Sequence, residues 1–509
     1  MSLSDPVAAA VAVLRRRPGD ILPLYLLGAA IPAIVRVVPF LAALVGYLYL
    51  ETTGRFETIR AHLTDIEAGP PDPETEPEAF QQWVSGFEPA VEQLLTPATV
   101  GLALLTIATV AILFLVLSSV ISAGQLGACY GRLRDERGLI AGIAAVRRYW
   151  TRILWLYVLE GLVWLAVGVA VALITAVAVG AASIAAGTAL LTAPVALLGI
   201  LVLLAVLAAV RALFAFAPVA VVVDDAGVFG SVSKSFGFVR RRPIGAGFYY
   251  ALSVGTMLAV STVSGVLMLV DVVSATSLVT VLVVLPALDL LKTALYVEYR
   301  GRLAPPTQPT RTLRAQFRDG LGRGWSELIA FVRSTPGTHA VVVALAGLGF
   351  AGGWLAADPF VGHYTTSIAA RLDGHVPPAA ALEFFGNNWL VAMTTTYAGV
   401  ALVIPAIVSV LFNGAFMGVY ARLEVEPAEL AAFILPHGVF EIPAIIVASA
   451  LGIRLGLVGW RAYRGRASRV AFADALERAF WVLLGVGLLL AVAAVIEGFV
   501  SPYYYRLFL

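Results

Sequence analysis

The chain has 509 residues, of which 60% are hydrophobic and only 13% are charged, and its formal net charge at pH 7 is +2. Soluble domains carry about 25% charged residues, so this composition excludes an ordinary soluble protein. The apolar residues form runs of about 20 or more, the length that crosses about 30 Å of hydrocarbon. Because the runs lack the alternation of barrel strands, we predict an all-α, polytopic transmembrane helical protein.

The first 300 residues are predicted to form a six-span membrane module. Arginine in short loops marks the cytoplasmic side, and Arg15, Arg16 and Arg17 precede the first apolar run, so the N-terminus is expected to be cytoplasmic. The acidic segment 51–96 then lies outside the cell. We expect spans near residues 21–50, 98–123, 153–181, 189–222, 244–270 and 278–297, with an arginine-rich loop between the second and the third.

A short apolar helix, an arginine cluster and a proline precede a span at two places, residues 7–23 and 231–247, and more loosely at 327–343. One interpretation is an elbow, in which the short helix lies in the membrane interface and proline permits the turn into the span. Another is an ordinary stop signal. Under the elbow interpretation the interface anchors are Arg15, Arg16, Arg17, Arg240, Arg241 and Arg242.

Residues 301–325 are rich in proline and arginine and are predicted to be a cytoplasmic linker to a second module, residues 326–509. Apolar stretches at 387–420 and 430–460, taken as single crossings, would leave the arginines of 461–469 outside the cell. One stretch must therefore contain an extra turn. The first would be a helix of about 50 Å and is the better candidate.

The first of these stretches offers Pro405, Asn413 and Gly414 as places to bend. The predicted total is about eleven spans, about six and then five, with an extracellular C-terminus. Broken or re-entrant helices in the second module would satisfy the arginine pattern equally well.

The stretch "FILPHGVFEIPAII" places His437 and Glu441 inside an apolar run. A charge at mid-bilayer costs about 2.5–3.5 kcal/mol, so such groups have partners. Four residues apart, the two share a helix face, and Pro436 and Gly438 beside His437 favour a broken helix.

Three interpretations of this pair stay open. It is a buried polar latch against Asn388 or Asn413, it lines a path for a solute or an ion, or it binds a metal. A metal site would need further ligands, and no HExxH or CxxC pattern supplies them, so no metal and no cofactor are expected. In the first module, Asp289 and Lys292 are three residues apart and could pair.

Four blocks of the second module, "FFGNNWLVAM", "LFNGAFMGVY", "ILPHGVFEIPAIIVASALGIRLG" and "AVIEGFVSP", together resemble the stage II sporulation protein M family of integral membrane proteins. The resemblance covers about residues 330–509 and implies five spans there. By matching position it implies the motif residues Asn387, Asn388, Asn413, Gly414, Pro436, His437, Gly438, Glu441, Pro443 and Glu497. In the first module, "FAPVAVVVDDAGVFGSVSKSFGFVRRRP" loosely resembles uncharacterised six-span membrane domains of salt-loving archaea.

The resemblance implies a non-enzymatic scaffold or membrane-organising component of the cell membrane. Its expected partners are the lipid bilayer and other membrane or cell-envelope proteins, and no oligomeric state follows from the sequence. The alternative is a transporter or channel whose path is lined by His437 and Glu441. No catalytic motif, nucleotide fingerprint or nucleic-acid-binding patch is found, so we expect neither an enzyme nor a nucleic-acid partner.

Overall fold

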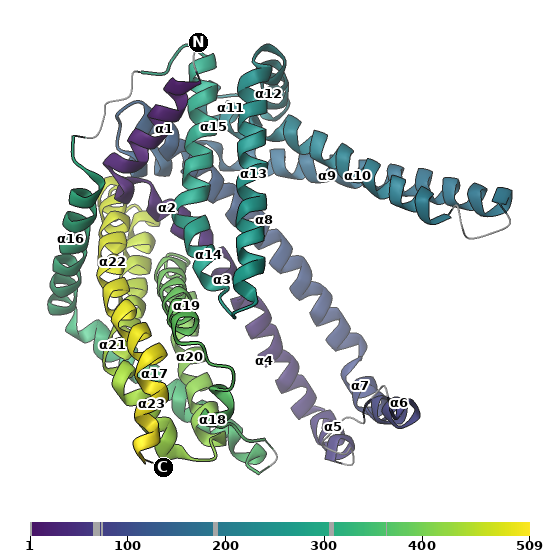
Figure 1. Cartoon of the computed structure of the whole chain (residues 1–509), viewed down its shortest axis with the longest axis vertical. Helices are drawn as coiled ribbons and strands as arrows, with labels where there is room; N and C mark the ends of the chain where they lie inside the picture. Colours follow the sequence, from purple (N-terminus) through teal and green to yellow (C-terminus); the bar gives the residue numbers. More distant parts are fainter. Residues whose placement is uncertain are drawn as a thin grey trace. The chain divides into compact units, whose positions relative to one another are not determined.

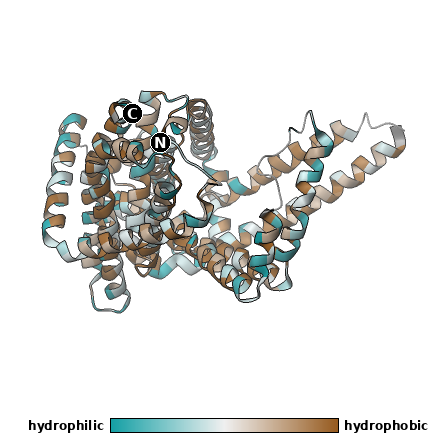
Figure 2. Cartoon of the chain, turned by 90° about the horizontal axis from the view of Figure 1, so that it is seen from below, coloured by the Kyte–Doolittle hydropathy of each residue, from teal (hydrophilic) through white to brown (hydrophobic). Residues whose placement is uncertain are grey.

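The computed structural model describes residues 3–508 except 65–71, 73–74, 187–191, 305–309 and 363. These residues are built almost entirely from helices, and extended pairing is limited there to the bridges Val361–Tyr364 and Thr366–Glu424 (Figure 1). Ten of the described helices are long and apolar enough to cross a membrane. Hydrophobic residues occupy most of the length of the long helices (Figure 2). The predicted all-α polytopic class is confirmed.

The contacts divide the chain into two compact units, Pro32–Val116 and Met1–Ile31 with Leu117–Leu509. In the smaller unit, Leu50, Ile59 and Ala90 form a small buried core. The predicted outer segment 51–96 contains three short helices, although residues 65–71 and 73–74 of it lie outside the described residues. The helices of this unit are α4 (Val37–Thr52), α5 (Arg55–Thr64), α6 (Pro77–Gly86), α7 (Glu88–Leu94) and the first part of α8 (Pro97–Leu133). The short helix α3 (Ile31–Val35) lies at the boundary.

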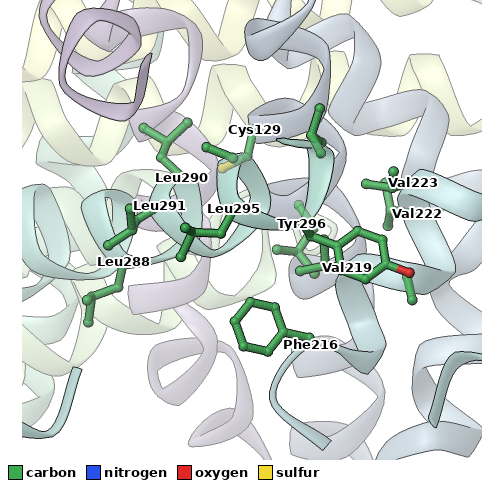
Figure 3. Close-up of a cluster of buried hydrophobic side chains, with 14 of the residues drawn as sticks. Cys129, Phe216, Val219, Val222, Val223, Leu288, Leu290, Leu291, Leu295 and Tyr296 are labelled. Atoms are coloured by element: carbon green, nitrogen blue, oxygen red, sulfur yellow. The ribbon is translucent and has the colours of Figure 1, made fainter. Parts of the chain in front are cut away.

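In the larger unit, the first helices enclose a core of apolar and aromatic side chains (Figure 3). Phe216, Leu290 and Tyr296 in this core have no exposed surface. The helices up to residue 299 are α1 (Ser4–Arg16), η1 (Pro18–Asp20), α2 (Leu22–Ala29), the end of α8, α9 (Gly138–Ala186), α10 (Thr192–Phe214), α11 (Ala217–Asp224), α12 (Val228–Arg241), α13 (Pro243–Met268), α14 (Ser274–Val279), the π-helical η3 (Thr280–Val284) and α15 (Leu285–Tyr299).

The predicted length of the arginine-rich loop between the second and third spans is wrong. Helix α8 runs to Leu133 and α9 begins at Gly138, so the loop is only a short turn. Hydropathy detects the part of a helix that faces lipid, whereas backbone hydrogen bonding continues into polar sequence as long as no proline or cap ends it.

All three expected elbow helices are present as separate helices. Helix α1 ends at Arg16 before Pro18, α12 ends at Arg241 before Pro243, and α16 (Leu313–Ser334) ends before Pro336. Proline disfavours helical backbone in the residue before it, and Arg17 and Arg242 accordingly lie outside the helical region. Their location in the membrane interface stays a prediction.

The second half of the larger unit is a bundle of long helices with short helical segments between and after them. They are α16, α17 (Pro336–Ala357), η4 (Asp358–Phe360), α18 (Ile368–Arg371), α19 (Pro377–Ala398), α20 (Ile404–Leu423), α21 (Pro427–Tyr463), α22 (Arg469–Phe499), α23 (Ser501–Tyr504) and η5 (Tyr505–Phe508). Residues 313–325 of the predicted linker form the first half of α16, and residues 305–309 lie outside the described residues. A boundary between two modules there stays a prediction.

The extra turn required by the arginine pattern is confirmed within residues 387–420. It occupies residues 399–403, between α19 and α20, where Leu402 and Val403 take left-handed backbone with φ of 61° and 71°. Pro405 opens α20, whereas Asn413 and Gly414, the other suggested bend, lie inside that helix. Helix α19 is long enough to span but is not among the ten apolar candidates, since it carries Glu383 and two asparagines.

The break expected at Pro436 and Gly438 is wrong. Helix α21 runs continuously through Pro436 and Pro443. Proline is tolerated inside membrane helices because neighbouring helices and local adjustments satisfy the freed carbonyl groups. The interruption in this half of the protein is therefore the turn at 399–403.

Candidate functional site

His437, Glu441 and Glu497 form one largely buried polar group, here called the His437 cluster. Each offers one ligand atom, and these three atoms all lie within 4.8 Å of one another. Nε2 of His437 is 3.7 Å from Oε2 of Glu441. His437 and Glu497 are each only 5% exposed. All three residues lie in helices long and apolar enough to span the membrane.

The hairpin of α21 and α22 assembles the cluster. His437 and Glu441 are one helical turn apart on α21, so their side chains lie on one face. The chain then reverses after Tyr463, and α22 returns along α21 until it brings Glu497 to the same level, close to its end at Phe499. Next to Glu497, a Cβ atom on Gly498 would lie 2.9 Å from the carbonyl oxygen of Pro377, so α19 also approaches closely here.

Every member of the cluster has a polar partner from another element. The side-chain amide of Asn388 on α19 donates to Oε1 of Glu441 at 2.9 Å. Nδ1 of His437 is hydrogen-bonded to the hydroxyl of Ser501 on α23 at 3.0 Å. Arg371 at the end of α18 lies 3.9 Å from Oε1 of Glu497. The predicted contact of the latch with Asn388 is confirmed.

Aromatic side chains cover one side of the cluster. The ring of Phe433, one turn before His437, meets the imidazole edge to face at 5.5 Å. Tyr505 packs on Phe433 at 6.4 Å, and the guanidinium of Arg371 lies over the same ring at 5.8 Å. The arrangement is a polar centre closed by rings and by the C-terminal helices, and its donor atoms face one another.

Comparison with known families identifies this part of the chain. Residues 340–502 match the model of the family described as Stage II sporulation protein M. The C-terminal part of this multi-pass membrane protein is therefore similar to that family over residues 340–502. The match contains the whole His437 cluster and confirms the predicted resemblance. Comparison with curated proteins gave no match, and comparison with solved structures gave none either.

The other family-motif residues in the stage II sporulation protein M region do not join the cluster. Asn387 is exposed and donates to the Asn388 side chain at 3.3 Å. Pro443 is exposed, and Pro436 is half-buried. Gly438 is buried on the same helix as the cluster. Asn413 and Gly414 lie on α20, so Asn413 is not the partner that closes the latch.

Glycines make a second distinctive feature of the same region, the contact between α17 and α20. A Cβ atom on Gly414 would lie 2.4 Å from the carbonyl oxygen of Ala346, and one on Gly353 would lie 1.9 Å from that of Ala415. Gly349 and Gly418 meet facing backbone in the same way. We call Gly349, Gly353, Gly414 and Gly418 the glycine contact. Their spacing of four residues on each helix is the small-residue pattern that lets membrane helices approach closely.

The predicted polar pair of the first module is also confirmed. Nζ of Lys292 lies 2.8 Å from Oδ1 of Asp289, and Asp289 in turn accepts a hydrogen bond from Tyr25 at 3.1 Å. Among the interface anchors, Arg16 is paired with Asp135 at 3.2 Å and Arg241 is hydrogen-bonded to Tyr299 at 3.5 Å. Neither contact tests their position relative to lipid.

Sequence reasoning did not find Arg371 or Ser501. Arg371 ends a four-residue helix, and Ser501 begins a similarly short one after α22, so neither lies in a pattern that points to α21. Glu497 was found through the family resemblance. Its position within an apolar run is a signal in its own right, because a lone carboxylate there requires a partner.

Proposed function

We propose that the protein is a non-enzymatic membrane scaffold of the stage II sporulation protein M type. The family match supports a membrane protein of this family. The resemblance brings with it the role of localising partner proteins at the membrane. On this proposal the His437 cluster maintains the shape of a surface that a partner recognises.

The observation that carries the proposal is that the polar atoms of the cluster contact other protein groups and are largely shielded from solvent. Its polar atoms form hydrogen bonds with groups of α19 and α23 and an ion pair with Arg371 of α18, and the imidazole of His437 is almost fully buried. Groups that line a path for a solute are expected to face water, whereas groups that hold helices together are expected to face each other. The cluster therefore supports a role in shape over a role in passage.

The test is a cross-linked pull-down from native membranes. Wild type is compared with a His437→Ala/Glu441→Ala double variant of equal abundance, and Asn387→Ala, which changes an exposed neighbour, is the matched control. We expect a defined set of partners with wild type and the control that is lost with the double variant. If wild type captures no partner, and purified protein in liposomes shows pH-dependent flux that His437→Ala abolishes, the scaffold is rejected in favour of transport.

A further inference from the structure

We propose that the His437 cluster binds a divalent metal ion of the Zn²⁺ class. The inference goes beyond the scaffold and does not depend on it, because an ion would bind to the isolated chain. It rests on three donor atoms that lie within 4.8 Å of one another and come from two helices long and apolar enough to span a membrane.

The donor set fits such an ion. One imidazole nitrogen with two carboxylate oxygens is a combination that Zn²⁺ accepts at about 2.0–2.2 Å from each ligand atom. Two ligands at those lengths around a tetrahedral ion are roughly 3.3 Å apart. The His437 and Glu441 atoms are already at 3.7 Å, so small side-chain rotations would complete this pair. Three protein ligands leave a fourth position for water.

The surrounding hydrogen bonds orient these atoms as metal ligands are oriented. Ser501 engages Nδ1 of His437, which leaves Nε2 facing Glu441. Asn388 engages Oε1 of Glu441, which leaves Oε2 facing His437. In metal sites, the ring nitrogen or carboxylate oxygen that does not bind the metal usually forms a hydrogen bond with a neighbouring group. That hydrogen bond fixes the orientation of the ring or of the carboxylate.

The local charge also favours a cation. Glu441 and Glu497 are two carboxylates in a largely buried group, and Asn388 and Ser501 are neutral. Arg371 forms an ion pair with Glu497 at 3.9 Å and its charge also reaches His437 and Glu441, but its side chain is 44% exposed, so water screens much of that charge. Burying a carboxylate without a counter-charge is costly. A divalent ion among the three donors would neutralise both carboxylates at once.

The first measurement is the metal content of the full chain, purified in mild detergent without chelator, by mass spectrometry of the elements. We expect about one Zn²⁺ per chain, or the same occupancy after chelation and titration with Zn²⁺ alone. Replacement by Co²⁺ should produce the visible absorption bands of a nitrogen- and oxygen-ligated ion. Wild-type protein without bound Zn²⁺ and without Co²⁺ bands would overturn the proposal, and no variant is needed for that result.

Variants then assign the ligands. Glu497→Gln and Glu441→Gln preserve side-chain shape and should weaken Zn²⁺ binding more than about 100-fold, since loss of an outer partner already costs about 10–100-fold. Asn388→Ala should fall within that outer-partner range. The matched control is Glu424→Gln, another buried carboxylate of the same region that bonds to Thr366. Equal Zn²⁺ affinity in Glu497→Gln, Glu441→Gln and the control would exclude this site. The pull-down reports on partners separately, so either proposal can fail alone.

Discussion

The His437 cluster and the glycine contact lie in the same family region but hold helices together by opposite means. The cluster joins α21 and α22 to their neighbours through polar side chains. The glycine contact joins α17 and α20 by having no side chain at all. Lipid is as apolar as leucine, so apolar burial alone gives membrane helices little reason to associate. Close backbone approach and interhelical hydrogen bonds are the two remaining means, and this region uses both.

The two helix contacts should be sensitive to different kinds of mutation. The glycine contact should fail when atoms are added, because the facing groups are backbone and cannot rotate away. The cluster should fail when atoms are removed, because each loss leaves a buried polar partner without a bond. Larger side chains should therefore destabilise the glycine contact, and smaller or apolar side chains should destabilise the His437 cluster.

The largest expected effect is that of Gly353→Ala. The added methyl group would lie 1.9 Å from the carbonyl oxygen of Ala415, so α17 and α20 must separate. We expect a loss of about 3 kcal/mol in the free energy of unfolding, the upper end of the usual cost of overpacking. Gly352→Ala is the control, since nothing lies within 4 Å of the corresponding position there. Unfolding in detergent, followed by circular dichroism, measures both, and equal stability of the two variants would refute the close contact.

The next effect separates the two neighbouring asparagines of "FFGNNW". Asn388→Ala removes the donor to Glu441 and should cost about 1–3 kcal/mol, because a largely buried carboxylate loses a hydrogen-bond partner. Asn387→Ala changes an exposed side chain and should stay within about 0.5 kcal/mol of wild type. The same unfolding measurement decides. A larger loss with Asn387→Ala would mean that the cluster is not closed by Asn388.

A smaller effect is expected for Ser501→Ala, which removes the hydroxyl bonded to Nδ1 of His437. One neutral hydrogen bond contributes about 1 kcal/mol. The control is Ser183→Ala, whose hydroxyl donates to the carbonyl oxygen of Gly180 on its own helix. Thermal unfolding of the two variants side by side should show the larger loss for Ser501→Ala, and the reverse order would place Ser501 outside the cluster.

The smallest loss of stability is expected at an exposed ion pair, that of Asp225 with Arg148 and Arg152. Hydrogen bonds from Arg148 and Arg152 lower the pKa of Asp225, whose side chain is 45% exposed. Its contribution to stability is therefore present above the unfolded pKa of about 4 and is lost as pH falls through the lowered folded value. Asp225→Asn should cost less than about 1 kcal/mol at pH 7. Unfolding at a series of pH values should show this difference shrinking below about pH 4, and a constant difference would contradict it.

Several local features could be predicted from sequence because their causes are local. Prolines 18, 243 and 336 end the elbow helices through the backbone of the residue before them. The arginines of 461–469 required an extra turn in one of two apolar stretches, and the turn at 399–403 lies in the one that was the better candidate, 387–420. The same local reasoning failed at Pro436, where it predicted a break. In a membrane bundle, neighbouring helices decide whether a proline interrupts a helix.

The sequence by itself determined the class of the protein, the approximate positions of its long apolar helices and the family that its C-terminal part resembles. Hydropathy and proline act over a few residues, and the family motif is a pattern of neighbouring residues. Only the tertiary structure decided that Glu497 and Ser501 meet His437, that Arg371 lies beside them, and that Asn388 rather than Asn413 closes the group. Those contacts depend on the rotation and depth of each packed helix, which apolar lipid leaves open and close packing between helices determines.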